Sequence, residues 1–190
     1  IVHNNEIWVS TKRKGIVLLT RNNVNYYTQQ FTTNEGLINN RTSHIAIDRE
    51  ENIWVASKKG VVQNPSSILS FLDKNDGLEI TNIYDFIIDA ENISWIATEQ
   101  GIFLMGKDEK GKNITREFII NDELLGKAFI SIYEDEKGYI WLGTYGYGVF
   151  CIHPDRKTVE NFSTSDGLAN KNVISITGKN SLIVFSTLGG

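Results

Sequence analysis

Tryptophan recurs along this chain at nearly equal intervals, and this repeat limits the possible folds more than any other feature. The four tryptophans, Trp8, Trp54, Trp95 and Trp141, lie 46, 41 and 46 residues apart. Each lies in a short hydrophobic run and is followed, three residues later, by a Thr or Ser. A period of this length made of short strands is typical of β-propeller blades, which are four-stranded antiparallel sheets.

A second marker, an acidic residue followed by Gly-Leu, keeps a constant distance from tryptophan. Its middle residue precedes the next Trp by 18 residues in three copies: Glu35–Leu37, Asp76–Leu78 and the degenerate Asp122–Leu124. No Trp follows the fourth copy, Asp166–Leu168, and there the run Leu182–Thr187 aligns with Val184 in the Trp position. The large differences in length therefore fall between each Trp and the next marker, as in a structural repeat with one tolerant loop.

The predicted fold is an all-β propeller of four-stranded antiparallel blades, three complete and two partial. The predicted blades span residues 1–31, 42–72, 83–120, 128–163 and 173–190. The second blade is expected to contain strands at Thr42–Ile47, Ile53–Ser57, Gly60–Gln63 and Ile68–Leu72.

The two partial blades leave two arrangements open. The first blade would keep only Ile1-Val2 of its first strand, and the last only the strands Val173–Ile176 and Leu182–Ser186. They could complete one another in a four-blade ring, or the chain could be a fragment of a larger propeller. Both partial blades keep the second strand, so they duplicate rather than complement one another, which favours the fragment.

Composition excludes several classes of protein. The 19 Lys and Arg against 23 Asp and Glu give a net charge of −4, which disfavours nucleic acid or an anionic membrane as the partner. No apolar run is long enough to span a membrane, so no membrane contact is expected within the segment. The single Cys151 cannot form an internal disulfide.

The repeated residues have competing interpretations. Exposed tryptophans could stack on sugars or bases, but their place within strands favours packing between blades. The Thr or Ser three residues on is expected to hydrogen-bond within the following turn. Asp48, Asp89 and Asp135, each six residues before a Trp, could bind calcium, but their spacing favours carboxylates that accept backbone N–H bonds of their own turn.

Signs of catalysis are scarce. The histidines, His3, His44 and His153, form no closely spaced pair, and no phosphate loop, dinucleotide fingerprint or Gly-x-Ser-x-Gly motif is present. The sequence therefore predicts no catalytic residue, no metal and no cofactor.

The segment Ser131–Phe150, SIYEDEKGYIWLGTYGYGVF, together with Phe162 and Asp166–Leu168, closely resembles the two-component regulator propeller repeat. The resemblance extends over the chain but is looser in the first two copies, where Ala56-Ser57 replaces Gly-Thr. It implies part of a seven-blade ring in the periplasmic sensor region of a hybrid two-component histidine kinase of the Bacteroidetes type. It also implies a response to oligosaccharides or another small ligand, a homodimeric full receptor, and kinase activity elsewhere in the polypeptide.

Alternating strand directions place the turns after each Trp strand on the same face as the connections between blades. Exposed Tyr, Asn, Lys and Arg side chains there could stack on and hydrogen-bond a sugar, or could form only a solvated rim. The predicted ligand-binding residues are Arg13, Lys58, Lys59, Tyr145, Tyr147, Asn170 and Lys171. The alternatives to a sensor module are a propeller hydrolase or lyase, which needs converging carboxylates or a His pair, and a protein-interaction scaffold, which needs a large apolar patch.

Overall fold

The described part of the chain consists almost entirely of antiparallel strands. A computed structural model describes residues 1–3, 5–22, 25–63, 70–72, 82–107, 113–120 and 124–189. It divides into two compact units, Ile1–Ile83 and Tyr84–Gly190. The marker Asp76–Leu78 and the first two residues of Asp122–Leu124 lie outside the described residues.

Two four-stranded sheets form the first unit. One has the order β1 (Val2–His3), β2 (Glu6–Ser10), β3 (Ile16–Asn22) and β4 (Asn25–Phe31), so the expected remnant of a first strand pairs with β2 as a two-residue strand. The other has the order β5 (Thr42–Ile47), β6 (Ile53–Ser57), β7 (Gly60–Gln63) and β8 (Ser70–Leu72). The bounds of β5, β6 and β7 are those predicted; the beginning predicted for the fourth strand, Ile68, lies outside the described residues.

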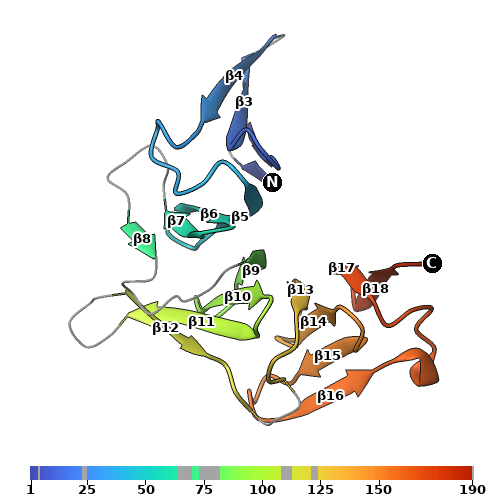
Figure 1. Ribbon diagram of the computed structural model, residues 1–190. Coiled ribbons are helices and arrows are strands. Elements are labelled where there is room, and N and C mark those ends of the chain that lie inside the picture. Colours follow the sequence, from blue (N-terminus) through green and yellow to red (C-terminus); the bar gives the residue numbers. More distant parts are fainter. Residues whose placement is uncertain are drawn as a thin grey trace. The chain divides into compact units, whose positions relative to one another are not determined.

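The second unit holds the remaining sheets (Figure 1). The first contains β9 (Ile83–Ile88), β10 (Ser94–Thr98), β11 (Ile102–Lys107) and β12 (Asn113–Glu117). The next contains β13 (Phe129–Glu134), β14 (Ile140–Thr144), β15 (Val149–Ile152) and β16 (Val159–Phe162), and the short 3-10 helix η2 (Thr164–Asp166) follows it. The last contains only β17 (Val173–Lys179) and β18 (Leu182–Thr187).

The registers of the first two strands repeat from sheet to sheet. Trp141 of β14 pairs with Tyr133 and Trp54 of β6 with Ala46, and in each sheet the register shifts at the start of the first strand. In the last sheet the same shift occurs and Val184 pairs with Thr177. Val184 therefore takes the Trp position, as the sequence alignment predicts.

Three of the four tryptophans are buried in the core, as predicted. Trp8, Trp54 and Trp95 are 6, 9 and 1% exposed. Trp95 belongs to a cluster in which the β9–β12 sheet packs on the β13–β16 sheet, through side chains such as Leu104, Phe150 and Ile152. Trp141 differs because it is only half-buried, although its ring packs on those of Phe162 and Phe185 at centroid distances of 6.0 and 5.6 Å.

The Asp that recurs six residues before a Trp has two roles. The sequence predicted the cap of its own turn but not the hydrogen bond to the Trp indole. One oxygen of Asp89 accepts the backbone N–H groups of Glu91 and Ile93 at 3.0 and 2.8 Å, which confirms the predicted turn cap. The other oxygen accepts the indole N–H of Trp95 at 2.7 Å. Asp48 and Asp135 hold Trp54 and Trp141 in the same way, at 2.7 and 3.0 Å.

The Thr or Ser after each Trp closes the next turn, as predicted. The hydroxyl groups of Thr11, Thr98 and Thr144 donate to the carbonyl oxygens of Gly15, Gly101 and Gly148 at 2.8, 2.8 and 2.7 Å. Ser57 does the same to Gly60 at 3.0 Å. Each hydroxyl therefore fixes the turn between the second and third strands of its sheet.

The acidic residue-Gly-Leu marker builds the connection between sheets. Asp166 accepts the backbone N–H of Ser163 at 2.9 Å, and Gly167 has a φ of 101°, in the left-handed region. In the first unit Glu35 accepts the N–H of Thr32 at 2.7 Å, and Leu37 returns to the core at 4% exposure. The marker therefore reverses the chain after the fourth strand and anchors it with leucine.

Candidate functional site

The turn from Tyr145 to Gly148 carries the two aromatic residues of the predicted site, and both are exposed. Tyr145 and Tyr147 are 59 and 51% exposed. Thr144 fixes their backbone, because its hydroxyl accepts the N–H of Tyr147 at 3.1 Å while donating to Gly148. Both rings can therefore offer an apolar face to a ligand from a fixed turn.

Two connections between sheets flank this turn. Gly148 donates its backbone N–H to the carbonyl of Lys171 at 2.9 Å, and Tyr145 donates to Ala128 at 3.3 Å. Asn170 precedes Lys171 and accepts the N–H of Asn172 at 2.8 Å. The structure thus brings Tyr145, Tyr147, Asn170 and Lys171 together on one end of the second unit, at the end of β14.

Two further residues join this cluster that the sequence did not predict. The Lys127 ammonium lies 4.8 Å from the centre of the Tyr147 ring, in a cation–π contact. The amide of Asn161 donates to the carbonyl of Tyr147 at 3.0 Å and to that of Val149 at 3.1 Å. Lys127 has the same repeat position as Lys171, two residues before the first strand of the next sheet, so alignment of the repeats was the available signal. We call Lys127, Tyr145, Tyr147, Asn161, Asn170 and Lys171 the tyrosine-turn cluster.

The other predicted residues form a separate basic surface within the first unit. Arg13, Lys58 and Lys59 are all exposed. The connection Asn39–Arg41 lies between their turns, because Gly15 donates to the carbonyl of Asn40 at 2.8 Å and Lys58 to that of Arg41 at 3.1 Å. This surface can attract an anionic group, and each unit thus has its own part of the predicted residue set.

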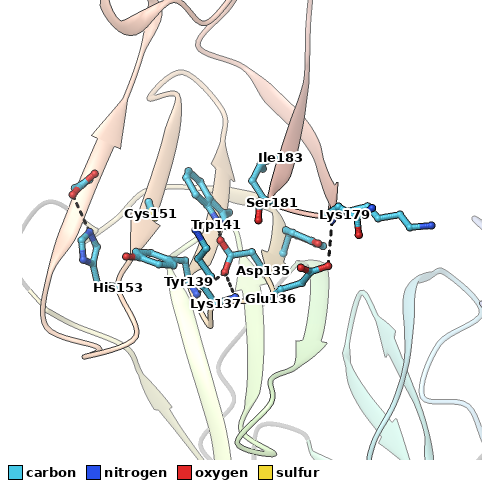
Figure 2. A pocket seen from close by; sticks show the side chains of 13 residues that line it. Asp135, Glu136, Lys137, Tyr139, Trp141, Cys151, His153, Lys179, Ser181 and Ile183 are labelled. Carbon is cyan, nitrogen blue, oxygen red and sulfur yellow. Dashed lines mark hydrogen bonds and ion pairs between the residues drawn. The ribbon is translucent and has the colours of Figure 1, made fainter.

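A cavity of about 390 Å³ lies at the opposite end of β14 from the tyrosine-turn cluster (Figure 2). The turn 135–139 and the turn 179–181 form its rim, and Trp141, Cys151 and Ile183 line it. None of the predicted binding residues lines this cavity. Its polar wall contains His153, whose ring nitrogen Nε2 lies 2.9 Å from Oε1 of Glu160.

The thiol of Cys151, which lines this cavity, is not an activated nucleophile. Burial, together with the nearby charges of Glu160 and Asp135, raises the pKa of the Cys151 thiol to about 12. The thiol is therefore protonated at neutral pH and is a poor nucleophile. Within the described ranges, no three His, Cys, Asp or Glu side chains cluster in a way that could hold a metal ion.

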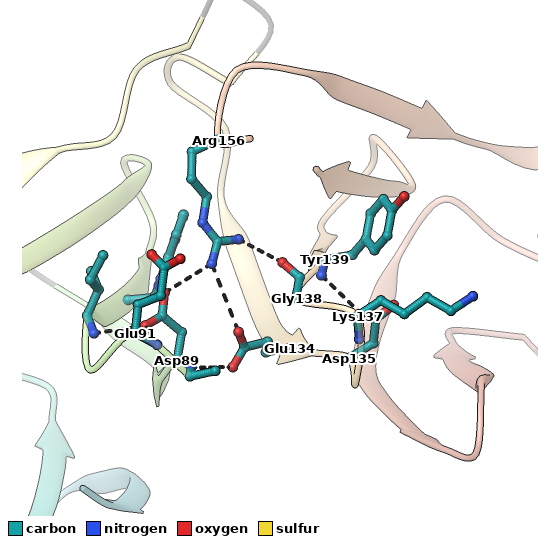
Figure 3. A network of polar contacts seen from close by, with 11 residues as sticks. Asp89, Glu91, Glu134, Asp135, Lys137, Gly138, Tyr139 and Arg156 are labelled. Atoms are coloured by element: carbon teal, nitrogen blue, oxygen red, sulfur yellow. Dashed lines mark hydrogen bonds and ion pairs between the residues drawn. The ribbon is translucent and has the colours of Figure 1, made fainter. Parts of the chain in front are cut away.

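A network of charged side chains around Arg156 joins the β9–β12 sheet to the β13–β16 sheet (Figure 3). Arg156 lies 3.2 Å from the buried carboxylate of Asp89 and 3.9 Å from that of Glu134, and donates to the carbonyl of Gly138 at 2.9 Å. Its guanidinium carbon lies 5.2 Å from the centre of the Trp95 ring. Burial raises the pKa of Glu134, while its hydrogen bond from Ala90 and the charge of Arg156 oppose that shift. Arg156 therefore links the β9–β12 sheet to the β13–β16 sheet through charged and hydrogen-bonded contacts.

The fold and the repeat agree with comparisons to known proteins. The chain aligns with the extracellular domain of the hybrid two component system BT3049 from B. thetaiotaomicron at a TM-score of 0.79 and 21% identity, over 98% of this chain and 26% of that one. It aligns with the extracellular domain of BT4673 from the same organism at a TM-score of 0.71 and 17% identity, over 98 and 25%. Virginiamycin B lyase from Staphylococcus aureus aligns at 0.68 and 11%, over 97 and 60%.

The chain is therefore built of β-propeller blades, as the period of the tryptophans predicts. The family model of the two component regulator propeller matches residues 123–146, which form the segment around Trp141. No curated protein matches the sequence. The chain spans about a quarter of the length of the two extracellular domains that it resembles. No helix among the described residues is long and apolar enough to cross a membrane.

Proposed function

We propose that this chain is part of the ligand-sensing region of a hybrid two-component sensor kinase and has no catalytic activity of its own. The observation that carries the proposal is the regulator propeller repeat at residues 123–146 within a fold similar to the BT3049 extracellular domain. The segment then lies in the periplasm, and the kinase belongs to another part of the polypeptide. Ligand binding would change the arrangement of a homodimeric receptor, because a ligand shifts a population toward the state that it binds better.

The tyrosine-turn cluster is the proposed contact with the ligand, an oligosaccharide. Sugar rings stack on exposed aromatic faces, and Tyr145 and Tyr147 offer two such faces on one short turn. Lys127 already covers one side of Tyr147, which leaves the other side for stacking. Asn170 and Lys171 supply hydrogen-bond donors next to the rings. On the first unit, Arg13, Lys58 and Lys59 form a cationic surface of their own, which is suited to acidic sugars.

The test is oligosaccharide binding by the complete sensor region, measured by isothermal titration calorimetry on a panel of neutral and acidic oligosaccharides. Tyr145→Ala together with Tyr147→Ala is expected to weaken binding about 30-fold, because each of the two lost stacks contributes about 1 kcal/mol. Tyr26→Ala together with Tyr27→Ala is the matched control, since these residues of β4 are equally exposed, at 53 and 61%, and lie outside the cluster. Unchanged binding in the Tyr145 and Tyr147 variant would contradict the assignment.

A propeller lyase is the second candidate, because virginiamycin B lyase shares the fold. A catalytic role would fall most naturally on the His153–Glu160 pair, which lines the cavity. Under the sensor proposal, His153→Ala and Glu160→Ala leave ligand binding and signalling unchanged. Turnover of a bound oligosaccharide that disappears in His153→Ala would favour the enzyme instead.

A further inference from the structure

Six of the 19 Lys and Arg residues of the chain lie at one end of the first unit. They belong to the turn 11–15 after β2, the turn 57–60 between β6 and β7, and the connection 39–41 before β5. All six are exposed, and we call them the basic end: Lys12, Arg13, Lys14, Arg41, Lys58 and Lys59. Because the whole chain has a net charge of −4, this positive charge is a local feature that can attract an anion.

Backbone hydrogen bonds fix the three segments of the basic end to one another. Gly15 donates its N–H to the carbonyl of Asn40 at 2.8 Å, so the first turn is tied to the connection. Lys58 donates its N–H to the carbonyl of Arg41 at 3.1 Å, so the second turn is tied to the same connection. An anion that contacts all three segments therefore meets a backbone that is already arranged, which lowers the cost of binding.

A buried threonine adds a second tie that the other sheets lack. The hydroxyl of Thr42, a residue only 7% exposed, accepts the N–H of Thr11 at 2.9 Å and lies 3.0 Å from the carbonyl oxygen of Gly15. The same register position holds the apolar residues Phe129 and Val173 in two sheets of the second unit. Thr42 thus holds the turn 11–15 in place from the side of the core.

The cations of the basic end are not used to hold the fold. None of the six side chains has an ion-pair or hydrogen-bond partner within the part of the chain that the structure describes. Glu35, the acidic residue of the connection 32–41, accepts the N–H and the hydroxyl of Thr32 at 2.7 Å each. Arg156 of the second unit differs, because it lies 3.2 Å from the buried Asp89 carboxylate.

We propose that the basic end binds the anionic groups of an acidic oligosaccharide and makes the sensor select such a ligand over a neutral one. The inference rests on the proposed oligosaccharide response and gives the first unit a ligand contact of its own. Arginine binds a carboxylate or sulfate through two parallel N–H bonds, and lysine adds a point charge. Because a single exposed ion pair contributes little, the ligand must carry several anionic groups along its chain.

Calorimetry on the complete sensor region tests this selection with tetragalacturonate, its methyl ester, and a chondroitin sulfate tetrasaccharide. The two acidic probes distinguish carboxylate from sulfate, and the methyl ester keeps the sugar rings without the charge. At least one acidic probe is expected to bind about tenfold or more tightly than the ester at low salt, and added salt should reduce this difference. Affinity for the ester equal to that for both acidic probes would overturn the proposal.

Paired arginine variants locate the contact. Arg13→Gln together with Arg41→Gln should weaken binding of the acidic probe about tenfold and leave binding of the ester unchanged. Arg21→Gln together with Arg49→Gln is the matched control, since it removes the same charge from exposed arginines of the same unit outside the basic end. An equal loss in the control would show that overall charge attracts the ligand, which would overturn the assignment.

The outcomes separate this inference from the proposed function. A neutral oligosaccharide that binds through Tyr145 and Tyr147, with no binding of either acidic probe, overturns the role of the basic end alone. If no oligosaccharide binds, the proposed ligand class fails as well. Binding to phosphatidylglycerol vesicles that is lost in the Arg13 and Arg41 variant, without oligosaccharide binding, would identify a membrane surface as the partner and overturn the saccharide assignment.

Discussion

Single carboxylates determine how the tryptophans of this protein are held. In each of three sheets one Asp oxygen caps the turn and the other accepts an indole N–H, so one side chain links a turn to the core. The environments differ: Asp89 is 3% exposed and also contacts Arg156, whereas Asp135 lies at the open cavity. The same residue in the same repeat position therefore contributes differently to stability.

Replacing these carboxylates should reveal that difference. Asp89→Ala is expected to destabilise the protein by about 3 kcal/mol, since it leaves a buried indole N–H and a mostly buried Arg156 without their partner. Asp135→Ala should cost about 1 kcal/mol, because water can reach the half-buried Trp141. Urea unfolding of both variants measures the comparison. Equal losses would mean that burial does not control the strength of this contact.

The lowered pKa of Asp155 predicts how its contribution to stability changes at acidic pH. Hydrogen bonds from the backbone of Lys157 and Thr158 and from the Thr158 hydroxyl lower the pKa of Asp155 to about 2. Because the folded pKa lies below the unfolded value of about 3.9, its stabilising effect is complete above pH ~4 and is lost as pH falls toward 2. Carboxyl NMR titration should give a midpoint near 2 for Asp155. Thr158→Val should raise that midpoint, and no change would contradict the role of the hydroxyl.

At the scale of the element, the turn between β14 and β15 depends on the close contact of Gly148 with the backbone of Phe162. A Cβ on Gly148 would lie 2.1 Å from the carbonyl oxygen of Phe162, and the residue has a φ of 79°. Gly146, two residues earlier, has a φ of 95° but has no atom within 4 Å of the corresponding position. The tight contact joins β15 to the end of β16, so this turn also positions the tyrosine-turn cluster.

Two glycine substitutions distinguish the cost of backbone strain from the cost of a steric clash. Gly146→Ala should cost about 1 kcal/mol, the penalty of the left-handed conformation alone. Gly148→Ala adds the collision with Phe162 and should cost about 3 kcal/mol or more. Thermal unfolding of the two variants provides the measurement. A Gly148→Ala protein as stable as Gly146→Ala would show that the backbone of β16 moves freely away.

At the scale of the whole molecule, burial of apolar side chains between sheets and one polar group hold the second unit. Arg156 comes from the turn after β15 and contacts Asp89 in the preceding sheet, 67 residues earlier. Its partners span the β9–β12 and β13–β16 sheets, so it resists their separation. Trp95, Phe150 and Ile152 belong to the apolar cluster between the same two sheets, and the Asp89 side chain is fully buried.

Removing Arg156 should therefore weaken the contact between these sheets. Arg156→Met is expected to cost about 2 kcal/mol, because the buried Asp89 charge loses its partner. Arg156→Lys should recover only part of this, since lysine cannot contact Asp89 and Gly138 through a planar fork. The exposed Arg49→Met is the control and should change stability by less than about 0.5 kcal/mol. A double-mutant cycle with Asp89→Ala measures the coupling, and additive effects would refute it.

Most of the fold could be predicted because its signals are local. The strands β5 to β7, the turn hydroxyls and the Asp caps all depend on residues within a few positions of one another, and strand alternation and turn chemistry follow from such patterns. The Trp position of Val184 also followed from the spacing of the repeat. The indole contact of Asp was missed although it lies within six residues, because turn capping already explained the aspartate.

The sequence by itself determined the blade, its strands and the turn on which Tyr145 and Tyr147 stand. Only the tertiary structure decided that Lys127 lies over Tyr147, that Arg156 reaches Asp89, and that Trp141 borders a cavity while Trp95 is sealed. The physical reason is that a period of two and a turn motif specify local backbone, whereas side-chain contacts between sheets depend on which faces pack together. The four tryptophans look alike in sequence, and the packing around each one decides whether its side chain is buried.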